Sequence, residues 1–316
     1  MQQDRSLVIG TRGSPLALAQ ARAVAALLAR VSPREPEIRT LRTSGDVLTD
    51  RPLAAFGGKG LFTKEIDEAL LSGAVDLAVH SMKDVPTLLP PGIVIAAVLP
   101  REDVRDVLVS PDRVPFADLP AGARVGTSSL RRRSQVLARR RDLAVVDFRG
   151  NVNTRLDKLR RGVAEATILA RAGLNRLGID ADAIGVTLDA IDVLPAPAQG
   201  AIGIACREGD ARIRAALAGF DDPATARAIR CERALLAALD GSCRTPIAAF
   251  ARDDNGRLVL DALIAEPDGS RIFRTRRDGS FADAEAIGRD AGAELRADAG
   301  AEFFAGLEAR YEAAQR

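Results

Sequence analysis

One local pattern occurs twice in this chain and limits the folds that the chain can adopt. An apolar run at residues 7–9 leads into Gly10-Thr11-Arg12-Gly13-Ser14-Pro15, and a helical stretch follows over residues 16–30. Further on, Arg124-Val125 leads into Gly126-Thr127-Ser128-Ser129, and a second helical run covers residues 130–140. A strand, a glycine turn and a capped helix place free backbone N–H groups at a helix start, which suits an anion. Each turn alone could be an ordinary βα connection, but the repetition predicts two related βα lobes.

A second pair of segments supports the repeat. The apolar runs 75–79 and 166–170 each follow a helical stretch that ends in a glycine, Gly73 or Gly162, a residue typical of helix ends. We therefore expect a parallel βα sheet in each lobe. Two facing lobes would form a cleft and would resemble a bilobal solute-binding, periplasmic binding protein-like architecture.

The connections between the lobes predict the domain boundaries. Residues 98–106 cross from the first lobe to the second, and the run Leu-Pro-Ala-Pro-Ala-Gln-Gly at 194–200 ends the second lobe. A strand at 201–206 and a helix at 210–218 would then return the chain to the first lobe through a double crossover hinge. We expect the first α/β lobe over 1–99 and 200–218, the second over 105–194, and a third domain over 222–316.

The third domain reads as a small α+β unit with a three-stranded antiparallel sheet. Asp222-Pro223 starts a helix that runs to about residue 239, before Gly241. Three strand-like runs follow, separated by hairpin turns, and two Ala-rich helices close the chain. The strands are expected at 247–252, 258–265 and 271–277, and the helices at 282–297 and 302–314.

Composition argues against several classes of function. Of 316 residues, 45 are basic and 43 acidic, and only 3% are aromatic, which disfavours a nucleic-acid-binding surface. Three cysteines and one histidine are too few for a structural metal site or a disulfide scaffold, so we expect no metal and a reducing, cytoplasmic setting. The longest apolar run, 93–99, is far shorter than the ~20 residues of a membrane span, and no signal peptide is expected.

Arginines concentrate in the second lobe. Arg131 and Arg132 follow the Gly-Thr-Ser-Ser turn, Arg149 and Arg155 flank a second Gly turn and helix start, and Arg176 follows the 166–170 run. Cations at a helix start oppose the helix dipole, so they need another reason to be there. Arginine pairs bidentately with carboxylates and phosphates, so the cluster predicts a site for a small polycarboxylate. The alternative is solvated surface charge.

Three further features could carry chemistry. Lys83-Asp84 follows a strand end, where α/β sheets place ligands, although it could simply be a pair that caps a turn. His80 is expected to be a hydrogen-bonded turn residue rather than a metal ligand. Cys243 lies in a loop beside Arg244, which could favour the thiolate, whereas Cys206 and Cys231 are expected in the core.

The segment over residues 49–60 could be a mobile lid, because Gly57-Gly58-Lys59-Gly60 gives it a flexible end. It lacks the spacing of a nucleotide-binding phosphate loop.

Taken in order, these motifs resemble the porphobilinogen deaminase (hydroxymethylbilane synthase) family over essentially the whole chain. The matching stretches are Gly-Thr-Arg-Gly-Ser-Pro-Leu-Ala at 10–17, Gly-Gly-Lys-Gly-Leu-Phe at 57–62, Ala-Val-His-Ser-Met-Lys-Asp-Val-Pro at 78–86, Gly-Thr-Ser-Ser-Leu-Arg-Arg at 126–132, Arg-Gly-Asn-Val-Asn-Thr-Arg at 149–155, Pro-Ala-Gln-Gly at 197–200 and Gly-Ser-Cys-Arg-Thr-Pro at 241–246. Each match alone would be weak, but so many in one order are specific.

The resemblance implies an enzyme of porphyrin and haem biosynthesis. Such enzymes join four porphobilinogen molecules head to tail, release ammonia, and give the linear tetrapyrrole hydroxymethylbilane. They carry a dipyrromethane cofactor, which here would be linked by a thioether to Cys243. Asp84 matches the catalytic carboxylate, which stabilises the azafulvene-like cation formed when the amino group leaves.

The resemblance also assigns binding residues, because every pyrrole carries acetate and propionate side chains. The cofactor would be held by Ser81, Lys83, Asp84, Thr127, Ser128, Ser129, Arg131 and Arg132. The substrate would be held by Arg12, Ser14, Arg149, Arg155, Arg176 and Gln199, with Lys59 and Phe62 in the lid.

Two other functions remain open from the sequence. The first is a non-enzymatic bilobal protein that binds a small polycarboxylate anion, since the fold alone does not separate a binder from an enzyme. The second, weaker one is nucleic-acid binding through the arginines. For the enzyme we expect a monomer, because no long heptad seam is present, and a product that could pass to a downstream cyclising synthase.

Overall fold

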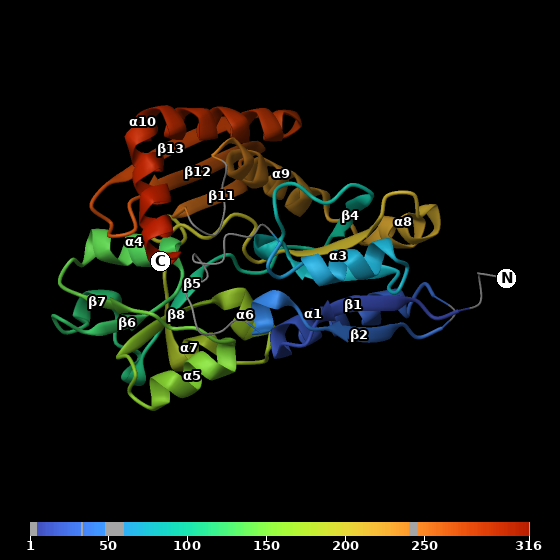
Figure 1. Ribbon diagram of the computed structural model, residues 1–316, viewed down its shortest axis with the longest axis horizontal. Helices are drawn as coiled ribbons and strands as arrows, with labels where there is room; N and C mark the ends of the chain where they lie inside the picture. The colour runs from blue at the N-terminus through green and yellow to red at the C-terminus, as the bar shows by residue number, and fades with distance from the viewer. Residues whose placement is uncertain (1–4, 33, 48–59, 240–244, 316) are drawn as a thin grey trace. The chain divides into compact units, whose positions relative to one another are not determined.

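The computed structural model describes residues 5–32, 34–47, 60–239 and 245–315 (Figure 1). Contacts within the chain divide it into two compact units. The first unit comprises the described residues up to Glu102 together with Gly200–Ala226, and the second comprises Asp103–Gln199 and the described residues from Arg227 onward. The second unit contains two separate sheets, so the expected division into three domains stays a prediction.

The first unit is built on a five-stranded sheet of order β2-β1-β3-β10-β4. Its strands are β1 (Val8–Arg12), β2 (Glu37–Leu41), β3 (Leu77–Ser81), β4 (Ile93–Val98) and β10 (Ile202–Arg207). β1 pairs in parallel with β2 and β3, but β10 lies between β3 and β4 and is antiparallel to both. The expectation of a purely parallel sheet was therefore wrong, because the returning strand enters the sheet from the opposite direction.

The second unit repeats this topology in the order β7-β6-β8-β5-β9. Its strands are β5 (Asp106–Val109), β6 (Arg124–Gly126), β7 (Ala144–Val146), β8 (Ala166–Ala170) and β9 (Gly185–Thr187). β6 is parallel to β7 and β8, and β5 is antiparallel to β8 and β9. β5 and β10, the strands that each follow a crossover, thus hold the same place in the two sheets, which confirms the double crossover.

Acidic side chains at the same position in each sheet also follow the repeat. The Asp76 carboxylate, just before β3, accepts a 2.9 Å hydrogen bond from the Val8 N–H at the start of β1. Glu165, just before β8, accepts a 2.6 Å hydrogen bond from the Arg124 N–H at the start of β6. The two halves therefore share side-chain detail as well as strand order.

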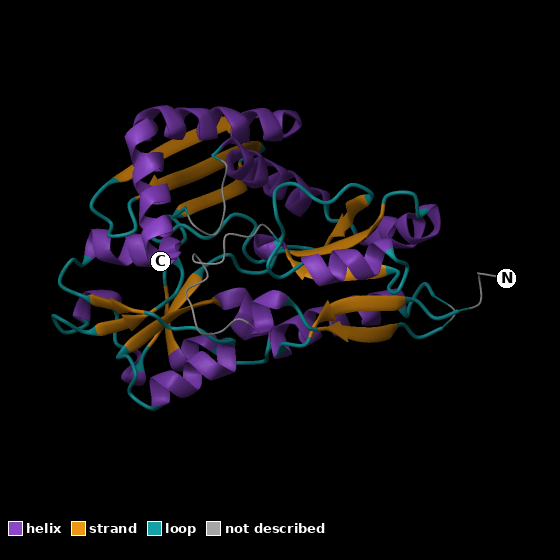
Figure 2. Ribbon diagram, viewed as in Figure 1, coloured by secondary structure: helices purple, strands orange, loops and turns teal. Residues whose placement is uncertain are grey.

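Helices cover both faces of each of these sheets (Figure 2). In the first unit, α1 (Pro15–Leu28) and α8 (Ala211–Leu217) pack on one face of the sheet and α3 (Lys64–Leu71) packs on the other. This unit also contains the short helix α2 (Ser44–Val47) and the 3₁₀ turns η2 (Met82–Asp84) and η5 (Ala218–Phe220). In the second unit, α4 (Leu130–Arg139) covers one face, and α5 (Val152–Arg160), α6 (Arg171–Arg176) and α7 (Ala181–Ile184) cover the other. The layers are those of a doubly wound α/β fold.

The third sheet is antiparallel, as expected, with the order β11-β12-β13. Its strands are β11 (Ile247–Asp254), β12 (Arg257–Ala265) and β13 (Ile272–Gly279), and α9 (Pro223–Ala238) and α10 (Ala284–Gln315) pack against one face around buried Phe303. Two closing helices were expected, and α10 is indeed divided into two helical stretches at Gly300, where φ is +75°. Cys206 and Cys231 lie in the cores, as expected, and burial raises the pKa of Cys231 to about 12. No helix in the described part of the chain combines the length and apolar character of a membrane span.

Candidate active site

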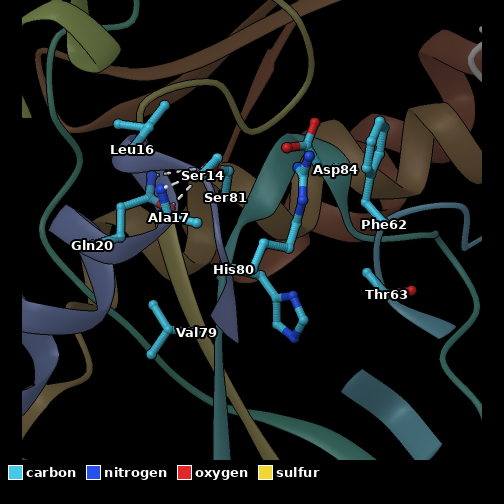
Figure 3. Close-up of a pocket in the computed structure, with 11 residues that line it drawn as sticks. Ser14, Leu16, Ala17, Gln20, Phe62, Thr63, Val79, His80, Ser81 and Asp84 are labelled. Atoms are coloured by element: carbon cyan, nitrogen blue, oxygen red, sulfur yellow. Dashed lines mark hydrogen bonds between the residues drawn. The ribbon is translucent and has the colours of Figure 1, made fainter. Parts of the chain in front are cut away.

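A small cavity in the first unit collects most of the predicted first-lobe residues. It lies at the carboxyl ends of β1 and β3 and has a volume of about 60 Å³ (Figure 3). Arg12, Ser14, Phe62, Ser81 and Asp84 line it, together with Gln20, Thr63 and His80. A space of this size takes one polar group of a ligand rather than a whole molecule.

The two loops that form this cavity are held by local hydrogen bonds. Ser14 caps α1 as expected: its hydroxyl accepts a 3.3 Å hydrogen bond from the Ala17 N–H, and Pro15 occupies the first turn. Gln20, which is 2% exposed, reaches from α1 to the end of β3, and its side-chain Nε2 lies 2.8 Å from the Ser81 hydroxyl. The hydroxyls that border the cavity are therefore pre-oriented by the fold.

The cavity is lined by a cationic side chain, Arg12, and by a neutral one, His80. The Arg12 guanidinium stacks 4.2 Å from the centre of the Phe62 ring, within the range of a cation–π contact. Burial, reinforced by the positive charge of Arg12, lowers the pKa of His80 to about 4, so the imidazole is neutral at pH 7. His80 lies inside β3 opposite Gly203, so the expectation of a turn residue was wrong.

The catalytic candidate Asp84 ends the 3₁₀ turn η2, directly after β3. The strand end and the turn place its side chain in the lining of the cavity, which it shares with Phe62 (Figure 3). Lys83, in the same turn, is exposed and does not line this cavity.

A second group of predicted residues gathers around one carboxylate in the second unit. Asp106, the first residue of β5, is 1% exposed. It accepts hydrogen bonds from Arg131 at 2.9 Å and from Arg132 at 2.8 and 3.1 Å, and a further one from Gln199 at 2.9 Å. Burial by itself would raise the pKa of Asp106, but the two guanidinium groups and these hydrogen bonds hold it well below the usual range.

The hydroxyls of the Gly-Thr-Ser-Ser turn shape the turn itself. Thr127 Oγ1 accepts from the Ser129 N–H at 3.2 Å, and Ser128 Oγ accepts from the Phe148 N–H at 3.0 Å. Ser129 caps α4 by accepting from the Arg132 N–H at 3.4 Å. These three predicted binding residues therefore keep the start of α4 in place, and binding through their hydroxyls stays a prediction.

The remaining arginines lie on three different elements of the second unit. Arg149 precedes α5, Arg155 lies within it, and Arg176 ends α6; all three are partly exposed. Arg155 donates a 2.8 Å hydrogen bond to the Gly150 carbonyl, which braces the glycine turn where φ is +122°. Lys59, Cys243 and nearly all of the predicted lid at 49–60 lie outside the described residues.

Sequence analysis missed Gln20, Thr63, Asp106 and Gln135. Gln20 and Gln135 occupy the same position of α1 and α4, so comparing the two repeats would have found both. Asp106 lies in the crossover segment at residues 98–106, whose sequence indicates only a connection between the lobes. Its partners become visible only when the tertiary structure brings residues 25 and 93 positions away to it.

The side chains of the second unit fit a ligand that carries carboxylates, such as dipyrromethane. In the part of the chain that the structure describes, the ion pairs of Arg131 and Arg132 both go to Asp106, so two buried cations share one buried anion. A buried net positive charge is costly unless a further anion approaches it. A carboxylate side chain of the cofactor would supply that anion.

Comparisons with known proteins agree with this reading. A family model described as "Porphobilinogen deaminase, dipyromethane cofactor binding domain" matches residues 7–215, and one described as "Porphobilinogen deaminase, C-terminal domain" matches residues 226–297. A porphobilinogen deaminase of Nitrobacter winogradskyi is 54% identical over 306 residues, covering 96% of each chain. The chloroplastic porphobilinogen deaminase of Pisum sativum is 52% identical over 314 residues, covering 96% of this chain and 85% of that one.

Among solved structures, an arginine-specific periplasmic binding protein of Salmonella typhimurium covers 70% of this chain and 94% of its own, at 17% identity and a TM-score of 0.38. That likeness is too weak to support a conclusion about fold or ligand. The two family models and the close relatives are sufficient without it: the chain belongs to the porphobilinogen deaminase family.

Proposed function

We propose that this chain joins four porphobilinogen molecules head to tail into hydroxymethylbilane, with Asp84 as the catalytic carboxylate. The observation that carries the assignment is the position of Asp84. It follows β3 directly and lines a cavity with Arg12, Ser14 and Ser81, in a chain that belongs to this family. A carboxylate at this point can accept hydrogen bonds from a pyrrole N–H and offset positive charge on the ring.

Each addition removes one ammonia and forms one carbon–carbon bond. The C–N bond of the protonated aminomethyl group breaks, the nitrogen leaves as ammonia with the electron pair of that bond, and the ring becomes an azafulvene-like cation. The free α-carbon of the preceding pyrrole attacks the exocyclic carbon, and that α-carbon then loses its proton, which the released ammonia can take up. Asp84 stabilises the cation, and the neutral His80 beneath it adds no competing positive charge at pH 7.

The dipyrromethane group, when bound, supplies the pyrrole to which the first substrate molecule is joined. We assign its attachment to Cys243 and its carboxylates to Lys83, Ser81, Thr127, Ser128, Ser129, Arg131 and Arg132. We assign substrate carboxylates to Arg12, Ser14, Arg149, Arg155 and Arg176. Gln199, which was expected in this group, is buried and donates both amide hydrogens, to the Val104 carbonyl and to Asp106, so we assign it a supporting place behind the arginines. The support is the motif match within the family and, for Arg131 and Arg132, the unbalanced buried charge.

Replacing Asp84 with Asn tests the catalytic assignment. We expect D84N to lose at least ~10²-fold in turnover, since an amide does not offset a developing cation, while its cofactor remains attached. A matched control is Asp118→Asn, because Asp118 ends the exposed 3₁₀ turn η4 (Phe116–Asp118) as Asp84 ends η2. Turnover of D84N close to that of D118N would remove Asp84 from the mechanism.

We further propose that the protein works in the cytoplasm as a monomer and passes its product to a cyclising synthase. The support from the sequence is a sparse, odd set of cysteines and the lack of an extended heptad pattern. The proposed product is an open chain, which a cyclising enzyme could take up. Sedimentation of the purified chain tests the oligomeric state, and a dimer at micromolar concentration would contradict a monomer.

A further inference from the structure

Asp106, the carboxylate that binds Arg131 and Arg132 in the second unit, has no role in the family assignment above. Asp106 is buried in the second unit and is not one of the described residues that line the cavity around Asp84, yet four hydrogen bonds from three side chains converge on it. The Oδ2 atom of Asp106 accepts hydrogen bonds from Arg131 and from the Nε of Arg132. The Oδ1 atom accepts from a terminal nitrogen of Arg132 and from Gln199. Arg132 is thereby held as a bidentate pair, in which an arginine fork has little rotational freedom. Arg131 is held at two points, by Asp106 and by the Leu194 carbonyl.

The cluster of Asp106, Arg131, Arg132 and Gln199 is hydrogen-bonded to both crossover segments of the chain. Asp106 itself opens β5 at the end of the first crossover, and Gln199 also donates a 2.7 Å hydrogen bond to the Val104 carbonyl there. Arg131 donates a 2.7 Å hydrogen bond to the Leu194 carbonyl at the start of the second crossover. Gln135, one turn further along α4, bonds both the N–H and the carbonyl of Leu194 at 2.8 and 3.0 Å.

The equivalent place in the first unit holds nothing of this kind. Where α4 carries Arg131 and Arg132 in its first turn, α1 carries Leu16 and Ala17, and only the glutamine one turn later, Gln20, is shared. The ion cluster is therefore an addition to one half of the repeat rather than a requirement of the fold. Such an asymmetry points to a ligand-related role.

We propose that Asp106 is a positioning residue, which orients Arg131 and Arg132 toward carboxylates of the cofactor and ties them to both crossover segments. The proposal rests on the proposed function, since it supposes that these arginines bind the cofactor. Asp106 partly neutralises the pair and leaves one positive charge for the ligand. A displacement of the second crossover segment would move Leu194, which accepts a hydrogen bond from Arg131. A displacement of the first would move Asp106 itself and Val104, which Gln199 binds.

Replacing Asp106 with Asn removes the charge and keeps the shape. The matched control is Asp76→Asn, because Asp76 is also buried and also pairs with arginine (Arg5), but lies in the first unit rather than in the unit that holds the arginine pair. Both variants remove a buried ion pair, so both are expected to lower thermal stability. Only D106N is expected to disturb the cofactor site.

The readouts are circular dichroism with thermal unfolding, the fraction of chains that carry the two-pyrrole mass increment, and the rate at which cofactor-free protein acquires it from porphobilinogen. We expect folded D106N to acquire the increment at least tenfold more slowly than the parent, which is ~1.4 kcal/mol. D76N is expected to load as the parent does. Should D106N not fold, Asp106→Glu keeps the charge but shifts it by one methylene, and slower loading is again expected.

Each outcome decides one claim. Loading of folded D106N, or in its place D106E, at the parental rate would overturn the positioning role. An equal loss of loading in D76N would overturn it too, since loss of stability would then explain the effect. If the parent protein itself never acquires the increment, the proposed function fails, and the Asp106 proposal falls with it.

Discussion

We predict that ionised Asp67 lowers the stability of the protein at neutral pH, so that replacing it with Asn stabilises the chain. The residue lies in α3, one turn after Thr63, and is 6% exposed. Desolvation by burial raises the pKa of Asp67 from 3.8 to about 6; the negative charge of Glu68 adds to the shift, and the Thr63 hydroxyl opposes it. A carboxyl group that resists ionisation in the folded state favours the unfolded state once the pH exceeds its unfolded pKa.

The size of the effect follows from the shift. A displacement from 3.8 to about 6 corresponds to ~3 kcal/mol at most, at ~1.4 kcal/mol per pKa unit. We expect about half of that, ~1–2 kcal/mol, because a carboxyl group near the protein surface regains water when it ionises. The loss of unfolding free energy caused by Asp67 is near zero below pH 4, where the carboxyl group is protonated in the folded form. This loss grows between pH 4 and 6 and is complete above pH 6.

Urea unfolding of the parent and of D67N across pH 4–8 measures this directly. We expect D67N to be more stable than the parent at pH 8 and nearly equal to it at pH 4. The exposed neighbour offers a matched control: Glu68→Gln removes a charge from the same helix and should change stability by only a few tenths of a kcal/mol. A D67N protein that is less stable than the parent at pH 8 would refute the reasoning.

Two further perturbations test the packing and the anion site. Gly126→Ala would place a Cβ 2.5 Å from the Phe148 ring, so it should lower the free energy of unfolding, measured in urea, by ~1–3 kcal/mol. Gly209→Ala is the control, because its Cβ would meet no atom within 4 Å and should change that free energy little. Equal effects of the two variants would contradict close packing under the Gly-Thr-Ser-Ser turn. Arg149→Leu should impair cofactor loading or chain growth because ligand carboxylates lose a partner, and unchanged turnover would place Arg149 outside the site.

Local signals in the sequence predicted much of the fold. Ser14 caps α1 and Gly73 and Gly162 adopt positive φ after helices, because caps and left-handed residues depend on a few neighbouring atoms. The repeat likewise predicted two matching sheets, and three strand-like runs separated by hairpin turns predicted the third. Strand direction was harder: the antiparallel entry of β5 and β10 depends on where a crossover lands, which no short segment encodes.

The site was only partly predictable for the same physical reason. The family resemblance singled out Arg12 and Asp84, with the position of Asp84 after a strand end in support, and both line one cavity. The arginines of α4 were noticed as charge, but their partner Asp106 is separated from them in sequence, and burial rather than composition makes it important. Likewise, the low pKa of His80 comes from enclosure within β3 and from Arg12, which the sequence does not reveal.

The central claim is that the chain carries a dipyrromethane group on Cys243 and extends it with porphobilinogen. Intact mass spectrometry of the purified chain beside a Cys243→Ala variant tests this most directly, before and after incubation with porphobilinogen. The account predicts an excess of two linked pyrrole units on the parent and none on the folded variant. A parent that stays at its bare mass after incubation, or a variant that carries the same excess, would contradict it.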